Sequence, residues 1–154
     1  MALENVDFGN INEIPYRPLR PGIDQAVFAM SGDGVNVTVN RVDNGNDLRP
    51  HTHDDHQQIA WILQGECDYY VDGEPFRMTA GSWVVVPKGV EHYIHVYDSP
   101  ETVVNVDIFA PAREDYNEAY SQFLKEQGYQ GYQGYQGYQG YQGYQGYQGF
   151  NIID

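Results

Sequence analysis

Histidine is concentrated in two short segments of the chain. All five histidines lie there, as His51, His53, His56, His92 and His95. Imidazole is the commonest side-chain ligand for transition metals near neutral pH. Because His51 and His53 are two residues apart, they lie on the same face of a β-strand and can share one ion. The pattern predicts a metal site with His92 as a ligand from a neighbouring strand, and the alternative is a set of surface histidines that binds no ion.

The charge balance excludes several classes of partner. Eight lysines and arginines stand against 22 aspartates and glutamates, which gives a net charge of -14. Such a field repels nucleic-acid phosphates and anionic lipid headgroups. The sequence has no apolar run of about 18 residues that would span a membrane and no export signal at its start. A single cysteine, Cys67, fits a reducing compartment. We therefore expect a cytoplasmic protein with no nucleic-acid partner and no membrane association.

Short apolar runs separated by turn residues extend over residues 26–110. The Asp72-Gly73 pair, for example, is a strong hairpin signal between two such runs. Strands this short, without helices between them, predict an antiparallel sandwich or barrel. One helix is expected over residues 114–127, where Tyr116, Tyr120 and Phe123 recur at helical spacing.

The two ends of the chain differ in composition from this central region. Residues 1–24 are rich in proline and glycine and are expected to form an extended arm before a domain at residues 25–127. An arm of this kind can pack along its own sheet or cover a sheet edge of a second copy, and we expect a homodimer. Residues 128–149 repeat Gly-Tyr-Gln, and residues 150–154 end the chain. The repeat is either a neutral expansion or a segment that mediates further self-association.

Two spaced motifs surround the histidines. They are Gly45-x5-His51-x-His53-x4-Gln58-x6-Gly65 and Gly81-x5-Pro87-x-Gly89-x2-His92. Both resemble the signature motifs of the cupin superfamily. The resemblance implies an all-β, single-domain jelly-roll barrel. It also implies that one divalent transition metal, Zn, Ni, Mn or Fe, is bound by His51, His53, Gln58 and His92.

Two positions depart from the usual cupin pattern. Gln58 stands where most cupins have a glutamate, and Val96 stands where the second motif often has an asparagine. A neutral amide ligand leaves the full double charge on the metal, whereas a glutamate would cancel part of it. The amide therefore stabilises the higher oxidation state of iron less than a glutamate does. Gln58 therefore favours isomerase or lyase chemistry over a cupin dioxygenase, which remains an alternative. Gln57 and His56 are rival ligands by proximity, but the cupin spacing favours Gln58 and leaves His56 beside the ligands or at the mouth of the site.

The expected strand over residues 103–109 has two faces of different character. One face carries Asn105, Asp107 and Phe109, and the other carries only aliphatic side chains. The polar face is either solvated above a core or directed at the metal while the aliphatic face packs elsewhere. The residues alone leave both interpretations open.

Over residues 25–113 the chain resembles the KdgF-type uronate-processing cupins of pectin and alginate breakdown. The resemblance implies conversion of a 4,5-unsaturated monouronate, a small sugar acid, into its linear 5-keto form. It implies that Asp107, Phe109 and Arg113 belong to the active site. In this reaction we expect Asp107 to transfer the proton, Arg113 to bind the substrate carboxylate and Phe109 to form an apolar wall for the sugar ring. Strand position adds Trp61 or Tyr69 to that wall. The alternative is that the protein is not an enzyme but a non-catalytic cupin that binds sugar or forms assemblies.

Overall fold

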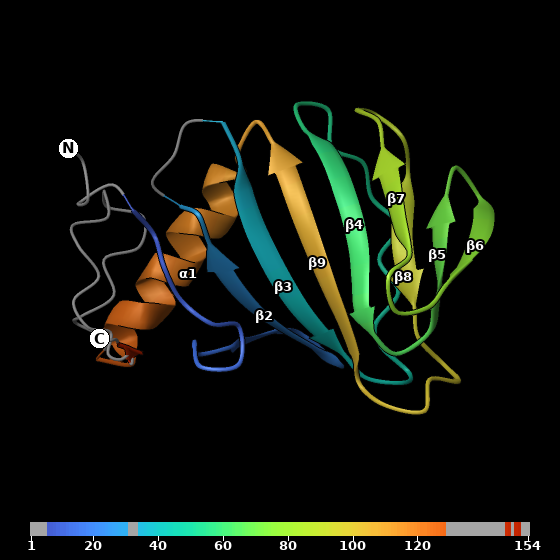
Figure 1. Ribbon diagram of the computed structural model, residues 1–154. Helices are drawn as coiled ribbons and strands as arrows, with labels where there is room; N and C mark the ends of the chain where they lie inside the picture. The colour runs from blue at the N-terminus through green and yellow to red at the C-terminus, as the bar shows by residue number, and fades with distance from the viewer. Residues whose placement is uncertain (1–5, 31–33, 129–146, 149, 152–154) are drawn as a thin grey trace. The chain divides into compact units, whose positions relative to one another are not determined.

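The computed structural model describes residues 6–30, 34–128, 147–148 and 150–151 (Figure 1). Within these residues the strands before the helix are β1 (Arg17–Arg20), β2 (Ile23–Phe28), β3 (Asn36–Val42), β4 (Gln57–Gln64), β5 (Cys67–Val71), β6 (Glu74–Met78), β7 (Trp83–Val86), β8 (His92–His95) and β9 (Val103–Ala110). They are followed by α1 (Glu114–Glu126), β10 (Tyr147–Gln148) and β11 (Phe150–Asn151). The prediction of a mainly β protein with one short C-terminal helix is confirmed.

The strands form two main sheets. A six-stranded sheet has the order β1-β2-β3-β9-β4-β7, and a three-stranded sheet has the order β6-β5-β8. Strand β4 pairs antiparallel with β7 and β9, and β5 pairs antiparallel with β6 and β8. Two antiparallel sheets of this kind are the layers of a jelly-roll barrel.

The chain divides into two compact units, and all five histidines lie in one of them. This barrel unit comprises Pro18–Gln25 and Thr38–Pro111. Its apolar core takes Ile62 and Val86 from the larger sheet and Tyr69 and Met78 from the smaller one. Because successive side chains of a strand point to opposite faces, one face of each strand enters this core.

The second unit, the helix unit, comprises the described parts of Met1–Arg17, Ala26–Val37 and Ala112–Asp154. Its core packs Tyr120 and Leu124 of α1 against Ile14 and Val27. The Tyr120 hydroxyl donates a hydrogen bond to the Pro15 carbonyl at 2.6 Å, which satisfies the one polar atom of this buried side chain. The helix therefore buries one face, as its apolar spacing predicts.

The structure describes most of the predicted N-terminal arm but little of the predicted C-terminal repeat. Residues 1–24, the predicted arm, contain β1 and the first residues of β2. The Gly-Tyr-Gln repeat at residues 128–149 lies almost wholly outside the described residues. Among the residues that are described, no helix is long and apolar enough to cross a membrane.

Candidate metal centre and active site

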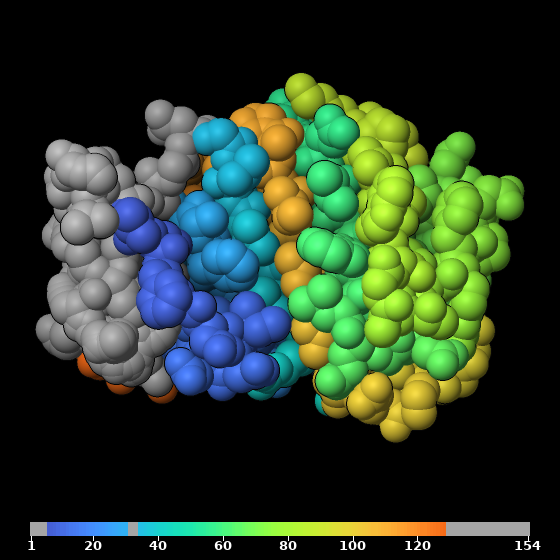
Figure 2. Space-filling view, in the orientation of Figure 1, coloured from blue at the N-terminus to red at the C-terminus, as the bar shows by residue number. Residues whose placement is uncertain are grey.

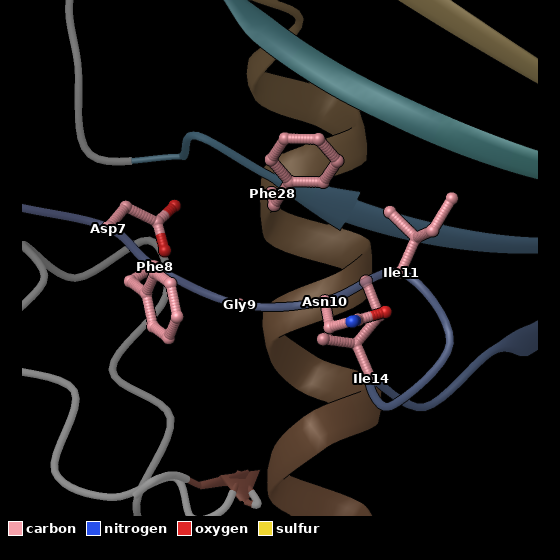
Figure 3. A pocket seen from close by; sticks show the side chains of 7 residues that line it. All are labelled: Asp7, Phe8, Gly9, Asn10, Ile11, Ile14 and Phe28. Atoms are coloured by element: carbon pink, nitrogen blue, oxygen red, sulfur yellow. The ribbon is translucent and has the colours of Figure 1, made fainter.

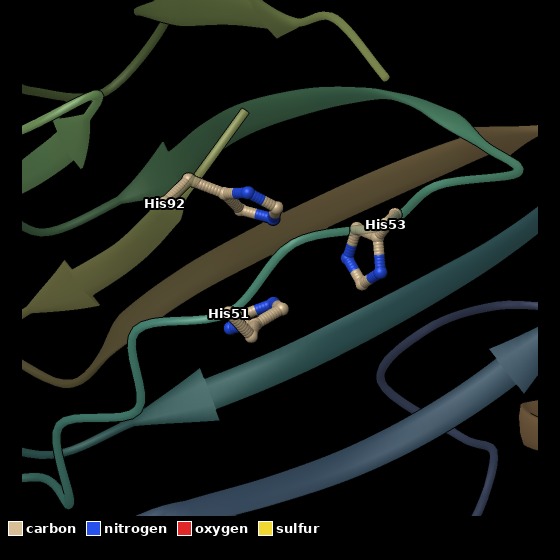
Figure 4. Close-up of side chains that lie close together, drawn as sticks. All are labelled: His51, His53 and His92. Atoms are coloured by element: carbon tan, nitrogen blue, oxygen red, sulfur yellow. The ribbon is translucent and has the colours of Figure 1, made fainter. Parts of the chain in front are cut away.

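Three histidines from two segments converge inside the barrel unit (Figure 4). His51 and His53 come from the segment before β4, and His92 begins β8. One ring nitrogen from each lies within 4.8 Å of the others. The ring centroids are 4.3 Å apart for His51 and His92 and 4.8 Å apart for each pair that includes His53. The structure therefore brings together three of the four predicted metal ligands as side chains that can hold one ion.

Backbone hydrogen bonds fix the two segments beside each other. His51 and His92 form an antiparallel bridge in which each backbone N–H donates to the other's carbonyl, at 3.2 and 3.0 Å. The Gly89 N–H donates to the His53 carbonyl at 2.8 Å. Gly89 has a φ of 77°, which glycine adopts without a steric penalty. The second motif thus positions the first through main-chain contacts.

The ring tautomers of two histidines follow from their hydrogen-bond partners. Nδ1 of His51 contacts the carbonyl of Arg49, and Nδ1 of His92 contacts the carbonyl of Val90 at 2.9 Å. A carbonyl only accepts hydrogen bonds, so Nδ1 carries the proton in both rings. In the neutral imidazoles the lone pair then lies on Nε2, the arrangement that metal-binding histidines use.

Gln58 completes the donor set. Its Nε2 donates to the Tyr69 hydroxyl at 3.0 Å, which leaves Oε1 facing His92 Nε2 at 2.9 Å. Two lone pairs that approach each other this closely need a shared cation or a proton between them. Three imidazoles and one amide oxygen suit a divalent transition metal. The residues present therefore fit the predicted metal.

Aromatic side chains line the same region. The Phe109 ring is buried and lies edge-on to His53 at 5.6 Å and to His56 at 6.3 Å.

His56 Nδ1 contacts the Pro111 carbonyl at 2.8 Å, and His56 is absent from the cluster that can hold an ion. Gln57 is exposed, on the opposite face of β4 from Gln58. Of the rival ligands, the structure thus places neither with the three histidines.

The polar face of β9 is its buried face. Asn105, Asp107 and Phe109 are 3%, 8% and 2% exposed, so the polar side chains point into the barrel unit. Asp107 lies opposite Ala60 on β4, and Phe109 lies opposite Gln58. The two pairs are two residues apart along the strands, so they are neighbours on the same face of the sheet. Of the two interpretations left open by the sequence, the solvated one does not match this burial.

The predicted ring-wall residues lie on different faces. Tyr69 is 3% exposed, and its ring stacks at 6.4 Å on that of His92. Trp61 is 43% exposed and occupies the opposite face of β4 from Gln58. Strands β4 and β7 both contribute to the surface in Figure 2. The structure does not bring Trp61 to the histidines, because alternation along β4 turns it outward.

Arg113 belongs to the helix unit and precedes α1. Its guanidinium pairs with the Asp115 carboxylate and lies 3.8 Å from the centre of the Tyr116 ring. Burial opposes the charge, but the Asp115 hydrogen bond holds the pKa of Arg113 above its usual value. Its backbone N–H donates to Asn36 Oδ1 at 2.8 Å. Arg113 is thus a fixed cation that already binds a carboxylate.

A pocket of about 190 Å³ lies in the helix unit (Figure 3). It is lined by Asp7, Phe8, Gly9, Asn10, Ile11, Ile14 and Phe28. Burial raises the pKa of Asp7, although the Ala29 N–H that donates to its carboxylate lowers it. No histidine or predicted site residue lines this pocket.

Comparison with known proteins agrees with the geometry. A protein-family model described as "Cupin domain" matches residues 24–109. The chain is a cupin. The pectin degradation protein KdgF of Dickeya dadantii (strain 3937) is 30% identical to this cupin over 105 residues, which cover 68% of the chain and 93% of the relative.

Solved structures extend the similarity. KdgF from Halomonas sp. has a TM-score of 0.64 and 28% identity, over 71% of this cupin and 98% of that chain. An RmlC-like cupin from Shewanella frigidimarina NCIMB 400 has a TM-score of 0.61 and 26% identity, over 71% and 94%. The KdgF-like resemblance inferred from the motifs is confirmed, and so is the jelly-roll fold.

The motifs missed two asparagines, Asn40 and Asn105, whose side-chain amides contact the Asp107 carboxylate. Asn105 was detectable only as a neighbour of Asp107 on one strand face. Asn40 lies on β3, far from Asp107 in sequence. The available signal was the alternation of polar and aliphatic residues in both segments, which does not say that the polar faces meet.

Proposed function

We propose that this cupin is a metal-dependent enzyme that opens the ring of 4,5-unsaturated monouronates from pectin or alginate and yields the linear 5-keto sugar acid. The observation that carries the proposal is the cluster of His51, His53 and His92 with the Gln58 oxygen beside it. The similarity to KdgF, which spans 93% of that relative, supports the same substrate class.

The four ligands in this proposal are His51, His53, Gln58 and His92. A divalent ion bound by them would supply Lewis acidity, which would stabilise negative charge on substrate oxygens. The role of Gln58 is to provide a ligand that cancels none of this charge. The Tyr69 hydroxyl holds the amide in the orientation that exposes its oxygen.

Asp107 is the proposed proton-transfer residue. Its carboxylate accepts the proton of the anomeric hydroxyl at C1, the C1–O5 ring bond breaks, and an aldehyde forms at C1. The electrons of the broken bond remain on O5, which becomes the oxygen of an enolate at C4 and C5. Asp107 then returns the proton to C4, and the C5 ketone forms. The reaction is an isomerisation that needs no oxidant or co-reactant.

The remaining residues orient the sugar in this proposal. Phe109 faces His53 and offers an apolar surface to the ring. The resemblance to KdgF-type cupins assigns Arg113 to the substrate carboxylate, which a guanidinium binds through two parallel hydrogen bonds. In this proposal the substrate carboxylate takes the place of Asp115 as the partner of Arg113. A local cation matters here, since the net charge of -14 otherwise repels an anionic substrate.

The test follows the ultraviolet absorbance of the C4=C5 double bond, which is conjugated with the carboxylate. Purified protein should accelerate the loss of absorbance over the spontaneous reaction, and removal of metal with a chelator should abolish the acceleration. Asp107→Asn should lower kcat by roughly 100-fold or more. Trp61→Ala is the matched control, because its side chain lies on the opposite face of β4 from Gln58.

A wild-type rate equal to the spontaneous rate would contradict the proposal. Oxygen uptake during the assay would favour the dioxygenase alternative instead. If sugar acids bind without turnover and Asp107→Asn changes nothing, the protein is a non-catalytic sugar-binding cupin.

A further inference from the structure

Two buried asparagines hold the carboxylate of Asp107. Asn40 Nδ2 donates to Oδ2 at 3.1 Å, and Asn105 Nδ2 donates to Oδ1 at 3.1 Å. The donors come from different strands, β3 and β9, so they reach the carboxylate from separate positions in the sheet. Asn40 and Asn105 are 7% and 3% exposed. Each carboxylate oxygen thus receives its own amide donor within the barrel unit.

The orientation of both amides is determined by chemistry. An ionised carboxylate only accepts hydrogen bonds, so the NH2 group of each asparagine must face Asp107. Consequently Asn40 Oδ1 and Asn105 Oδ1 point elsewhere. Both oxygens are buried and have no hydrogen-bond partner among the described residues.

This arrangement is unfavourable for stability alone. A buried acceptor without a partner loses its hydrogen bond to water and gains none in return. The neighbouring inward positions on β4 are Ala60 and Ile62, which carry no polar atom in their side chains. Apolar residues are therefore acceptable on this inner surface. The hydrogen bonds that their NH2 groups donate to the Asp107 carboxylate explain why asparagines occupy these two positions.

We infer that Asn40 and Asn105 are positioning residues that fix the plane of the Asp107 carboxylate for proton transfer. This inference rests on the proposed function of Asp107. A carboxylate held at both oxygens keeps its remaining lone pairs in fixed directions. Preorganised groups of this kind lower the cost of reaching the productive geometry.

Kinetics of Asn40→Ala and Asn105→Ala test the inference. Each variant should lower kcat by roughly tenfold or more and leave KM within about twofold. KM is spared because the asparagines act through Asp107. The solvent deuterium isotope effect on kcat should increase, since proton transfer becomes more rate-limiting. Ser99→Ala is the control: Ser99 is also buried, and its hydroxyl forms hydrogen bonds with backbone groups of Glu66 and Glu101.

A double-mutant cycle separates positioning from general structural damage. In an Asp107→Asn background, loss of Asn40 or Asn105 should have little further effect on kcat. An equal loss of kcat in both backgrounds would overturn the inference, because the asparagines would then act independently of Asp107. Unchanged kcat in both alanine variants would overturn it as well.

Side-chain amide resonances give a readout that needs no turnover. Asp107→Asn should shift the NH2 signals of Asn40 and Asn105 in a nitrogen–proton correlation spectrum, and the other asparagine amides should serve as the internal control. Unshifted signals would overturn the inference. If the wild type opens no uronate but Asp107→Asn shifts both signals, the proposed function is contradicted, while the contact of Asn40 and Asn105 with the Asp107 carboxylate is still supported.

Discussion

At the scale of single residues, three side chains of the candidate metal centre have partners that fix their donor atoms. His51 and His92 both use the carbonyl of the residue two positions earlier, so their tautomers are set locally. Gln58 depends instead on Tyr69, a residue of the other sheet. The amide of Gln58 can rotate about its terminal torsion, and the tyrosine hydroxyl is what prevents this rotation.

Removal of the Tyr69 hydroxyl should therefore weaken metal binding. Tyr69→Phe leaves Gln58 Nε2 without its acceptor, and the affinity for metal should fall by roughly 10- to 100-fold. Competition with a coloured chelator measures the affinity. Trp61→Ala should leave it unchanged, because Trp61 faces away from Gln58. Equal effects of the two substitutions would contradict this role of Tyr69.

Cys67 gives a prediction about pH. Burial raises the pKa of its thiol from 9.0 to about 12, an effect that the nearby Arg77 partly offsets. Between these values the unfolded state has lost a proton that the folded state retains, so stability falls as pH rises above 9.0.

Urea unfolding at mildly and strongly alkaline pH tests this expectation. Wild type should lose about 1 kcal/mol more per pH unit than Cys67→Ala in this range. The comparison cancels the titration of tyrosines and lysines, which both proteins share. Identical slopes for the two proteins, or rapid reaction of the folded thiol with a disulfide reagent, would contradict the buried state of Cys67.

At the scale of elements, alternation along the strands decides which chemistry enters the barrel unit. Strand β9 turns Asn105 and Asp107 inward, and β3 turns Thr38 and Asn40 inward. Strand β4 contributes Gln58 from the same face as its apolar core residues. Polar side chains thus occupy inner positions on neighbouring strands, beside an apolar core of the same unit.

The turn between β4 and β5 holds these strands through a close approach. Gly65 has a φ of 84°, and a Cβ there would lie 2.8 Å from both Ser99 Oγ and Val103 Cγ2. Gly73 has a φ of 80° in the β5–β6 turn, but a Cβ at that position would meet no atom within 4 Å. The two glycines therefore share a backbone conformation and differ in their surroundings.

Alanine at the two positions should separate these effects. Gly73→Ala should cost about 1 kcal/mol of unfolding free energy, the penalty of a left-handed conformation. Gly65→Ala should cost about 1–3 kcal/mol more, because the methyl group meets packed atoms. Urea unfolding measures both. Equal losses would show that the turn between β4 and β5 adjusts to the added carbon.

At the scale of the whole molecule, charge is the dominant feature. The net charge of -14 favours expansion through self-repulsion, and salt screens this repulsion. The ion pairs of Arg77 with Glu66, Asp68 and Asp98 are exposed and oppose the trend only weakly. The homodimer predicted from the sequence stays a prediction, which sedimentation velocity tests.

Salt should accordingly stabilise the protein. Raising sodium chloride from about 0.02 M to about 0.5 M should increase Tm by a few degrees, because the Debye length shrinks from tens of ångströms to a few. Differential scanning calorimetry measures the change, and an equal osmolarity of an uncharged sugar is the control. A decrease in Tm would mean that attractive ion pairs outweigh the repulsion.

The fold class and the candidate metal ligands follow from the amino-acid sequence alone. Local geometry predicts the short strands and places His51 and His53 on one face. The resemblance of the two motifs to the cupin signatures is what implied Gln58 and His92 as further ligands. The helix was equally predictable from its apolar period and its stop at a glycine, and it is observed at Glu114–Glu126.

Which strand faces point inward depends on tertiary packing. Alternation shows that Asn105 and Asp107 share a face, but the packing of two sheets selects that face for the interior. The same packing turned Trp61 outward and brought Asn40 to Asp107. These contacts join residues distant in sequence, and they depend on sheet order, which no local pattern encodes.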